Sequence, residues 1–509
     1  MLYQLAARMT TKTQDKETFH SILQQLIEKT AHDHPYHTLP IILALANANK
    51  DVMIAYNKKA GRLSRNAPQV SDASHADQDR MQAAASMVDR LRSGKTDRII
   101  RDMEKLSDAY IELAEWDVSQ FKKVTKPINF PTNLQICTLT NLQTAVATVD
   151  IPVDLNCRYG NIVTIQKFEL TFKLAGGINL PKIIKCIGSD GVTRRQLVKG
   201  KDDLRQDAVM QQVFGLVNHL LAQNPETRQR QLHIRRYKVV PLSQRSGILE
   251  WCEGTVPLGL YLLGNQKTDF GAHKRYRPDD KTSLQCRRLM QDSHSGDGNS
   301  RYRTFLKVCS GHFKPVFRHF FFEKFLEPAV WFEKRLAYSR SAATCSIVGY
   351  VVGLGDRHVQ NILIDCNSAE LVHIDLGVAF EQGRILPTPE TIPFRLTRDL
   401  VDGMGVAGVE GVFRRCCEKT MEVMRHNQEA LLAVLEVAFL ECCLRSTYDW
   451  TMSPMKALAL QKQQDKLEAD GLGGDTNTSA TVGNMSSFNI DQMDITGGRG
   501  TRPSRTRRR

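Results

Sequence analysis

The chain has 509 residues, of which 41% are hydrophobic, 7% aromatic and 24% charged, and this composition is that of a globular protein long enough for three or four domains. The formal net charge of +14 is weak evidence for nucleic-acid binding, because six arginines fall in the last eleven residues and the rest of the chain carries about +8. No apolar run approaches the roughly 18 residues of a transmembrane helix and no signal-peptide core opens the chain, so we expect no membrane association.

The N-terminal part of the chain shows helical periodicity only. Apolar residues recur at helical spacing from Phe19 to Ile27 and again from Ile99 to Leu113. The polar stretch 61–79 between them contains Pro68 and predicts a loop. Residues 1–130 are therefore expected to form an antiparallel array of helices without chemistry of its own.

Residues 131–253 are expected to form a small antiparallel sheet. Segments 133–149 and 162–174 are rich in residues that favour strands, and shorter strand-like runs follow at 182–187 and 195–198. The Asp190-Gly191 pair between the last two runs predicts a tight hairpin. A helix at 204–222 and a strand pair around 242–251 complete this region.

Residues 254–460 are expected to be mainly helical, interrupted by strand-like segments at 361–365 and 371–374. The charged, Ser-rich stretch 274–302 predicts a polar loop. Residues 461–509 are polar and Gly-rich, which predicts a disordered tail. Its arginines fit a solvated terminus, a nuclear-import signal or a nucleic-acid contact, and direct nucleic-acid binding is not inferred.

The cysteines indicate the compartment. None of the twelve belongs to a C-x-x-C pair, and the doublets at 416–417 and 442–443 do not have zinc-finger spacing. Unpaired cysteines of this kind favour a reducing compartment, the nucleus or the cytoplasm.

A first cluster of polar residues suggests nucleotide chemistry. Lys199 ends a strand-like run and is followed by Asp202 and Asp207 at the start of a helix. Such a lysine can reach nucleotide phosphates while an acid holds it in place, and Asp207 is the better candidate for that acid. Alone, a basic and acidic run is more often solvated surface.

A second and a third cluster suggest phosphoryl transfer. Asp356, His358 and Asn361 lie in a loop ahead of a strand. There Asp356 can act as base, His358 can place a hydrogen-bond donor near the transferring phosphoryl group, and Asn361 can coordinate a metal. Asp375 ends the next strand, and the turn 366–370 would bring it beside Asn361. Paired oxygen ligands of this kind suit Mg²⁺.

A glycine turn is the fourth feature. Gly176 and Gly177 lie between strands, where backbone amides could approach phosphates, although an ordinary turn explains them equally well. G-x-x-x-x-G-K-[ST] does not occur, which excludes a Walker-type site, and the one G-x-G-x-x-G, at 403–408, does not follow a strand-like segment, so a dinucleotide-fold site is not expected.

Together these clusters resemble the phosphatidylinositol 3- and 4-kinase superfamily, whose catalytic loop reads D-R-H-x-x-N, as residues 356–361 do. Within it, residues 197–424 are most similar to the phosphatidylinositol 3-kinase-related protein kinases. The resemblance implies an α+β, bilobal kinase fold. An antiparallel-sheet N-lobe at 131–253 and a helical C-lobe at 254–460 would follow the C-terminal part of a helical FAT region at 1–130.

The resemblance also implies roles for single residues. The phosphate-covering loop would run from Gly176 through Gly177 to Lys182. Lys199 would bind ATP phosphates, with Asp207 as its acidic partner. The adenine hinge would consist of Glu250, Trp251 and Cys252. Asp356 and His358 would be catalytic, and Asn361 and Asp375 would hold Mg²⁺, with Mn²⁺ as an alternative. Residues 376–395 would be the activation loop.

The implied function is phosphorylation of serine or threonine followed by glutamine in protein substrates, in the response to DNA double-strand breaks and in cell-cycle checkpoints. The implied setting is the nucleus and also the cytoplasm, with a homodimer in the full-length protein and a DNA-break sensor complex as partner.

Two departures leave alternatives open. The resemblance fades after Glu436, and the tail at 461–509 has no recognisable FATC segment, while the start is expected to be internal to a larger protein. A truncated, non-catalytic product acting as an interaction surface therefore remains an alternative. A phosphoinositide lipid kinase is a second one, disfavoured because Arg384 and Arg395 are the only basic residues of 376–395.

Overall fold

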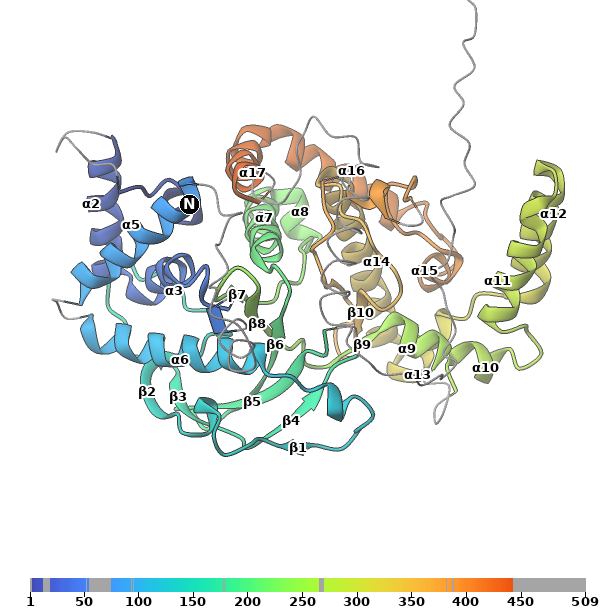
Figure 1. The fold of residues 1–509 in the computed structure, drawn as a ribbon. Coiled ribbons are helices and arrows are strands. Elements are labelled where there is room, and N and C mark those ends of the chain that lie inside the picture. Colours follow the sequence, from blue (N-terminus) through green and yellow to red (C-terminus); the bar gives the residue numbers. More distant parts are fainter. Residues whose placement is uncertain are drawn as a thin grey trace, which may run out of the picture. The chain divides into compact units, whose positions relative to one another are not determined.

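The computed structural model describes residues 2–11, 19–51, 53–54, 75–92, 94, 96–176, 179–264, 270–380, 382–386 and 389–442 (Figure 1). All of them lie within the unit Met1–Met452. The predicted tail at 461–509 lies outside the described residues, as does most of the predicted loop at 61–79.

The N-terminal region is helical, as predicted, and its helices are α1 (Leu2–Ala6), α2 (Phe19–Asp33), α3 (Pro35–Ala46), α5 (His75–Leu91) and α6 (Asp97–Glu115). Leu23 and Ile27 of α2 are buried in a core shared with α3 and α5, whereas Phe19 is 62% exposed. The buried face of α2 is therefore narrower than its apolar spacing predicts. Helix α5 begins at His75, so residues 75–79 are helical and not part of a loop.

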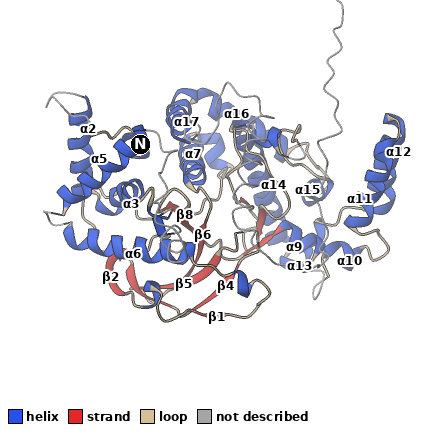
Figure 2. Ribbon diagram, in the orientation of Figure 1, coloured by secondary structure: helices blue, strands red, loops and turns tan. Residues whose placement is uncertain are grey.

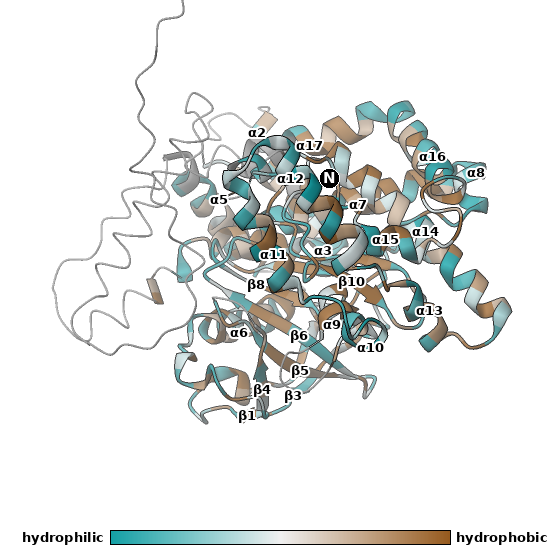
Figure 3. Cartoon of the chain, turned by 90° about the vertical axis from the view of Figure 1, so that its right-hand side faces the viewer, coloured by the Kyte–Doolittle hydropathy of each residue, from teal (hydrophilic) through white to brown (hydrophobic). Residues whose placement is uncertain are grey.

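The second region is an antiparallel sheet, as predicted (Figure 2). Its strands are β1 (Ile128–Asn129), β2 (Thr140–Ala145), β3 (Thr164–Phe168), β4 (Thr171–Leu174), β5 (Lys182–Gly188), β6 (Thr193–Gly200), β7 (Val239–Pro241) and β8 (Ser246–Glu250). The strand order is β1-β4-β5-β6-β8-β7, with β3 also paired to β5 and β2 paired to β3. Hydrophobic residues run along much of β5 (Figure 3), whereas in β6 only Leu197 and Val198 are hydrophobic.

The hairpin between β5 and β6 forms where the sequence predicts it. Gly191 adopts a φ of 74°, which favours glycine, and the backbone N–H of Val192 donates to the Asp190 carboxylate at 3.1 Å. The long strand predicted at 133–149 is shorter, because residues Gln135–Cys137 form a 3₁₀ helix and only β2 is extended.

Helix α6 lies across the sheet and shares its core (Figure 1). The Tyr110 hydroxyl donates to Oε1 of Gln196 at 2.6 Å, and both side chains are buried. Lys182 of β5 donates its Nζ to the carbonyl oxygens of Ala114 and Trp116 at 2.9 and 2.8 Å, where a cation complements the helix C-terminus. These hydrogen bonds join α6 directly to the sheet.

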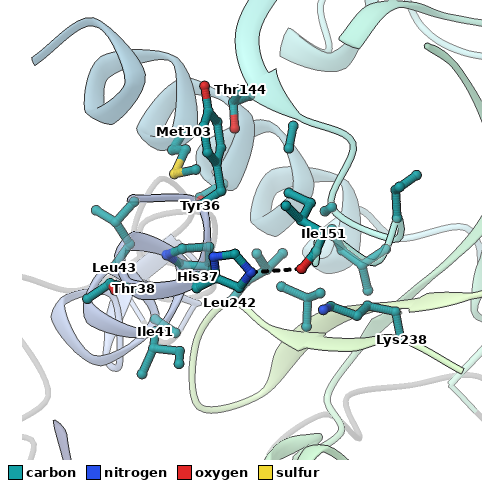
Figure 4. Close-up of a pocket in the computed structure, with 18 of the residues that line it drawn as sticks. Tyr36, His37, Thr38, Ile41, Leu43, Met103, Thr144, Ile151, Lys238 and Leu242 are labelled. Atoms are coloured by element: carbon teal, nitrogen blue, oxygen red, sulfur yellow. Dashed lines mark hydrogen bonds between the residues drawn. The ribbon is translucent and has the colours of Figure 1, made fainter. Parts of the chain in front are cut away.

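A cavity of about 440 Å³ lies between the helical array and the sheet, lined by α3, α6, β2 and β7 (Figure 4). His37 closes one side, because its Nε2 donates to the carbonyl oxygen of Ile151 at 2.8 Å. Apolar side chains such as Leu43, Met103 and Leu242 line most of the rest. The two regions thus meet along a mainly apolar surface.

The third region is mainly helical, as predicted. Its helices are α7 (Arg205–Gln223), α8 (Pro225–Gln229), α9 (Leu258–Leu263), α10 (Ala272–Tyr276), α11 (Ser283–Asp292), α12 (Gly298–Lys307), α13 (Arg318–Lys324), α14 (Pro328–Val351), α15 (Arg398–Gly403), α16 (Val412–His426) and α17 (Gln428–Cys442). A three-stranded sheet of β9 (Thr255–Pro257), β10 (Ile362–Asp365) and β11 (Leu371–His373) accompanies them. Helix α7 packs into the core of this region although it follows the strand β6 of the larger sheet.

The predicted polar loop at 274–302 is wrong, because α11 and α12 occupy most of it. Thr282 and Gln285 form a capping box at the start of α11, and Asp297 accepts from the backbone N–H of Ser300 at 2.8 Å at the start of α12. These caps satisfy backbone donors that the helices leave unpaired, so a polar segment can be helical.

None of the helices in the described ranges combines the length and the apolar character that crossing a membrane requires.

Candidate active site

Lys199 lies near the end of β6, in the middle of the sheet, where it pairs with Gly247 of β8. Its Nζ lies 3.0 Å from Oδ2 of Asp202 and 3.5 Å from Oδ1 of Asp375, and the side chain is 14% exposed. Burial would lower the pKa of Lys199, but the carboxylates of Asp375, Asp202 and Asp207 outweigh it and raise that pKa. Lys199 is therefore a fixed cation that joins the two lobes.

Asp207 lies in the first turn of α7 and is buried. Its Oδ1 accepts from the backbone N–H of Leu376 at 2.9 Å, next to Asp375. Burial raises the pKa of Asp207 to about 6, although Lys199 and the Leu376 N–H act in the opposite direction. Asp207 was predicted as the acid that holds Lys199. In the structure Asp202 and Asp375 form the ion pairs with Lys199, and Asp207 binds the backbone of the Asp-Leu-Gly segment.

The catalytic loop predicted at 353–361 brings its polar side chains together. Nδ2 of Asn361 donates to the backbone oxygen of Asp356 at 3.1 Å and lies 3.4 Å from its Oδ2. Nε2 of His358 lies 3.9 Å from the same carboxylate oxygen. Asp356 itself has a φ of 55°, a left-handed backbone conformation that costs a residue other than glycine about 1–2 kcal/mol.

A backbone hydrogen bond determines the proton position on His358. The N–H of Gln360 donates to Nδ1 of His358 at 3.1 Å, so Nδ1 is the acceptor. In the neutral imidazole the proton is then on Nε2, the nitrogen that faces Asp356. His358 can thus donate a hydrogen bond into the site.

The predicted turn between two strands brings Asn361 and Asp375 to one place. Strands β10 and β11 pair antiparallel with Ile362 opposite His373, and the N–H of Ile374 donates to the oxygen of Asn361 at 3.1 Å. Because Nδ2 of Asn361 is used by Asp356, its Oδ1 is the atom left for a metal, and the Asp375 side chain is 52% exposed. Two oxygen ligands of this kind suit a divalent ion that takes most of its shell from phosphates and water.

Arg357 is a functional residue that the sequence analysis did not assign. Its buried guanidinium donates to the backbone oxygens of Gly355 and Ile374, both at 2.7 Å, and also to that of Asp375. Burial lowers the pKa of Arg357 from its usual value. The motif D-R-H contains the arginine itself, but its partners at Ile374 and Asp375 are 17 and 18 residues away, so no local pattern shows its contacts.

The glycine turn joins β4 and β5, next to the strand that carries Lys199. The N–H of Ala175 donates to the oxygen of Pro181 at 2.8 Å, and Gly176 is exposed. Gly177 lies outside the described residues. The predicted loop ends earlier than expected, because Lys182 belongs to β5 and its ammonium is buried against α6.

The predicted hinge follows β8. Oε2 of Glu250 accepts from the N–H of Lys238 at 2.9 Å, and the Trp251 ring lies 5.1 Å below the guanidinium of Arg195. Glu250 and Trp251 both line a cavity of about 680 Å³. Lys199 is not among the residues that line this cavity. Burial raises the pKa of the Cys252 thiol to about 12, so that thiol is neutral.

Known proteins identify the family. Residues 195–444, which contain Lys199 and the catalytic loop, match the family model of phosphatidylinositol 3- and 4-kinase. A serine-protein kinase ATM of Sus scrofa is 58% identical over 468 residues, 91% of this chain. The chain belongs to the phosphatidylinositol 3- and 4-kinase family. A serine/threonine-protein kinase ATM of Arabidopsis thaliana is 45% identical over 93% of the chain. The chain spans 15% and 12% of the length of these two relatives.

Solved structures of this family have the same fold. The FAT and kinase domain of CtTel1 superposes with a TM-score of 0.76 at 36% identity, covering 92% of this chain and 31% of that chain. The complete CtTel1 dimer with C2 symmetry gives the same TM-score and identity, covering 92% of this chain and 16% of that one. The predicted α+β kinase fold behind a helical segment is therefore confirmed, and so is the resemblance to the related protein kinases and, within them, to ATM.

Proposed function

We propose that this chain is the catalytic part of an ATP-dependent serine/threonine protein kinase. The observation that carries the proposal is the joining of Lys199, the catalytic loop and Asp375 by direct contacts, in a chain whose relatives are named as serine- or serine/threonine-protein kinases. Because the chain spans 15% of the first of these relatives, the activity of a whole protein is part of the proposal.

The residues have distinct tasks in phosphoryl transfer. The Lys199 ammonium binds and orients phosphate oxygens of ATP. Asp356 accepts the proton of the attacking hydroxyl while the new bond from oxygen to the γ-phosphorus forms. The bond from that phosphorus to the bridging oxygen breaks, and ADP leaves with the electron pair. Nε2–H of His358 stabilises charge on the transferring group.

Asn361 and Asp375 are proposed to hold the metal. Their oxygens fit Mg²⁺, with Mn²⁺ as an alternative, and a bound ion would neutralise charge on the phosphates. Among the described residues no group of three or more His, Cys, Asp and Glu side chains is arranged to hold a metal, which fits a site that relies on one carboxylate and one amide.

A protein substrate is favoured over a phosphoinositide by the activation loop. Lipid head groups with several phosphates are recognised by clustered basic side chains. Arg395 is half-buried, and its Nη1 lies 3.5 Å from the backbone oxygen of Arg357, so it does not face a head group. Arg384 is then the exposed basic residue in the described part of the loop.

The finer expectations rest on the family resemblance described in the sequence analysis. We propose that the phosphorylated serine or threonine precedes glutamine and that the pathway is the response to DNA double-strand breaks and checkpoint control. The nucleus, and also the cytoplasm, is the proposed location, and a DNA-break sensor complex is the proposed activator. A homodimer of the full-length protein is proposed because a CtTel1 relative was solved as a C2-symmetric dimer.

Transfer of radiolabelled phosphate tests the activity. The purified chain is offered a Ser-Gln peptide, the matched Ser-Ala peptide and phosphoinositide vesicles, and we expect label on the Ser-Gln peptide. Asp356→Ala or Asp375→Ala should lower the rate at least ~10²-fold, whereas Asp292→Ala at the exposed end of α11 should not. Stronger labelling of lipid would overturn the protein substrate. Equal rates in all variants would favour the non-catalytic alternative.

A further inference from the structure

A carboxylate of the activation loop, that of Glu390, accepts a hydrogen bond from the backbone of the catalytic loop. The backbone N–H of Asp356 lies 3.0 Å from both Oε1 and Oε2 of Glu390. Glu390 is 34 residues away in sequence and carries no motif signal. Both carboxylate oxygens of Glu390 thus accept from one backbone N–H, that of Asp356, the residue proposed as the base.

The hydrogen bond to Glu390 is made by a residue, Asp356, whose backbone conformation is unfavourable. The φ of 55° at Asp356 is unfavourable for a residue with a side chain, and such conformations persist only where surrounding contacts determine them. Arg357 fixes the carbonyl side of the loop, and Asn361 binds the backbone oxygen of Asp356. Glu390 supplies the acceptor on the N–H side.

Two glycines make room for the carboxylate. A Cβ atom at Gly355 would lie 2.7 Å from Oε2 of Glu390, and one at Gly383 would lie 2.5 Å from the same atom. The N–H of Glu390 also donates to the oxygen of Gly383 at 3.0 Å, which closes the loop on itself. A side chain at either position would displace the carboxylate from the Asp356 N–H.

We infer that Glu390 is a positioning residue that sets the direction of the Asp356 carboxylate and couples the order of the activation loop to that of the catalytic loop. The inference deepens the proposed kinase function and rests on it for its kinetic part. Among the described residues, the hydrogen bonds of Glu390 are with Asp356 and Gly383, whereas Lys199 pairs with Asp202 and Asp375, so ATP binding should be independent of the Glu390 contact.

The kinetic test compares Glu390→Ala with Glu390→Gln in the full chain. The alanine variant has no acceptor, and we expect kcat to fall by about 10- to 100-fold while KM for ATP changes by less than about 2-fold, since misdirecting one reacting group acts on the chemical step. The glutamine variant keeps an amide oxygen and should recover most of kcat. Gly383→Ala should behave like Glu390→Ala. Equal losses in the alanine and glutamine variants, or a large rise in KM for ATP, would overturn the inference.

Amide hydrogen exchange provides a readout that needs no activity. We expect the segment 354–361 to exchange at least about 10-fold faster in Glu390→Ala than in the unmodified chain or in Glu390→Gln. Glu410→Ala is the matched control, because Glu410 is an exposed C-lobe glutamate whose ion pair is with Arg414. Unchanged exchange at 354–361 in Glu390→Ala would overturn the inference, even if the chain transfers phosphate. Faster exchange at 354–361 in a chain that transfers no phosphate would contradict the proposed kinase function and leave the positioning role of Glu390 intact.

Discussion

The guanidinium of Arg357 ties the catalytic loop to the segment that follows β11 and carries Asp375. It is 6% exposed, and its partners are backbone oxygens on both sides of the metal site. A planar fork of donors can serve diverging carbonyl groups at once, whereas an ammonium group is a single point of charge. The register between Asp356 and Asp375 therefore depends on the shape of this side chain as well as on its charge.

Replacing Arg357 by lysine should separate shape from charge. Arg357→Lys leaves at least one buried carbonyl without a donor, and we expect the free energy of unfolding to fall by about 2 kcal/mol or more and phosphate transfer to fall at least about 10-fold. Denaturant unfolding and peptide phosphorylation measure the two effects. The control is Arg301→Lys on the exposed surface of α12. Equal stability of both variants would show that charge alone is sufficient at Arg357.

Single residues were predictable where spacing along the chain carried the information. Asp356, Asn361 and Asp375 follow from a loop, a strand and a turn that are local in sequence, and the structure shows the contact of Asn361 with Asp356 and the pairing of β10 with β11. The spacing could not show that Asp202 pairs with Lys199 while Asp207 binds the Leu376 N–H, because the contacts of these two acids depend on how α7 packs. Glu390 could not be found, since its partner is 34 residues distant and no periodicity points to it.

Helices and strands could be predicted where the local sequence signals agreed with one another. The Asp190-Gly191 turn and the strands beside it formed as expected, because turn chemistry and strand propensity agree there. Helices α11 and α12 were missed because a charged composition was given more weight than the caps at Thr282 and Asp297. The strand expected at 133–149 was shortened by packing of its first part under α6, which no local signal reveals.

An ion pair links two elements of different regions. Nε2 of His233, which precedes β7, lies 3.1 Å from Oε1 of Glu370 in the turn between β10 and β11. The hydrogen bond that His233 donates to Glu370 raises the pKa of His233 above its ordinary 6.5, and the same bond lowers the pKa of Glu370 below 4.5. The pair therefore ties the turn that positions Asp375 to the segment that leads into the sheet.

The contribution of this pair should depend on pH. The stabilisation that comes from the raised pKa of His233 is present below pH 6.5 and is lost as pH rises through that pKa. The stabilisation that comes from the lowered pKa of Glu370 is present above pH 4.5 and is lost as pH falls through that pKa. Glu370→Gln should therefore lower the urea midpoint more at pH 5.5 than at pH 8.5. Because His233 is 46% exposed, the difference should stay below about 1 kcal/mol. Glu418→Gln on α16 should show no such pH dependence, and a larger effect at pH 8.5 would contradict the assignment.

Across the whole described molecule, the helical array reaches the nucleotide lysine through a short chain of contacts. Asp51 is buried, and its Oδ2 accepts from the Ser243 hydroxyl at 2.8 Å and from the Arg245 N–H at 2.7 Å. The oxygen of Arg245 in turn accepts from the N–H of Asp202 at 3.0 Å, and Asp202 forms the ion pair with Lys199. The turn between β7 and β8 thus connects the N-terminal helices to the phosphate end of the site.

Removing Asp51 should weaken nucleotide binding from a distance. In Asp51→Ala the turn loses its charged acceptor, and we expect the affinity for a fluorescent ATP analogue to fall by about 3- to 10-fold, as for a coupling of about 0.5–2 kcal/mol between linked sites. Equilibrium titration measures it without requiring phosphate transfer. Asp108→Ala is the matched control, because Asp108 lies in the same helical array and pairs with Lys50 at the surface. A similar loss of affinity in both variants would mean that the helical array acts through general stability, and an unchanged affinity in Asp51→Ala would show that Lys199 is positioned by the sheet alone.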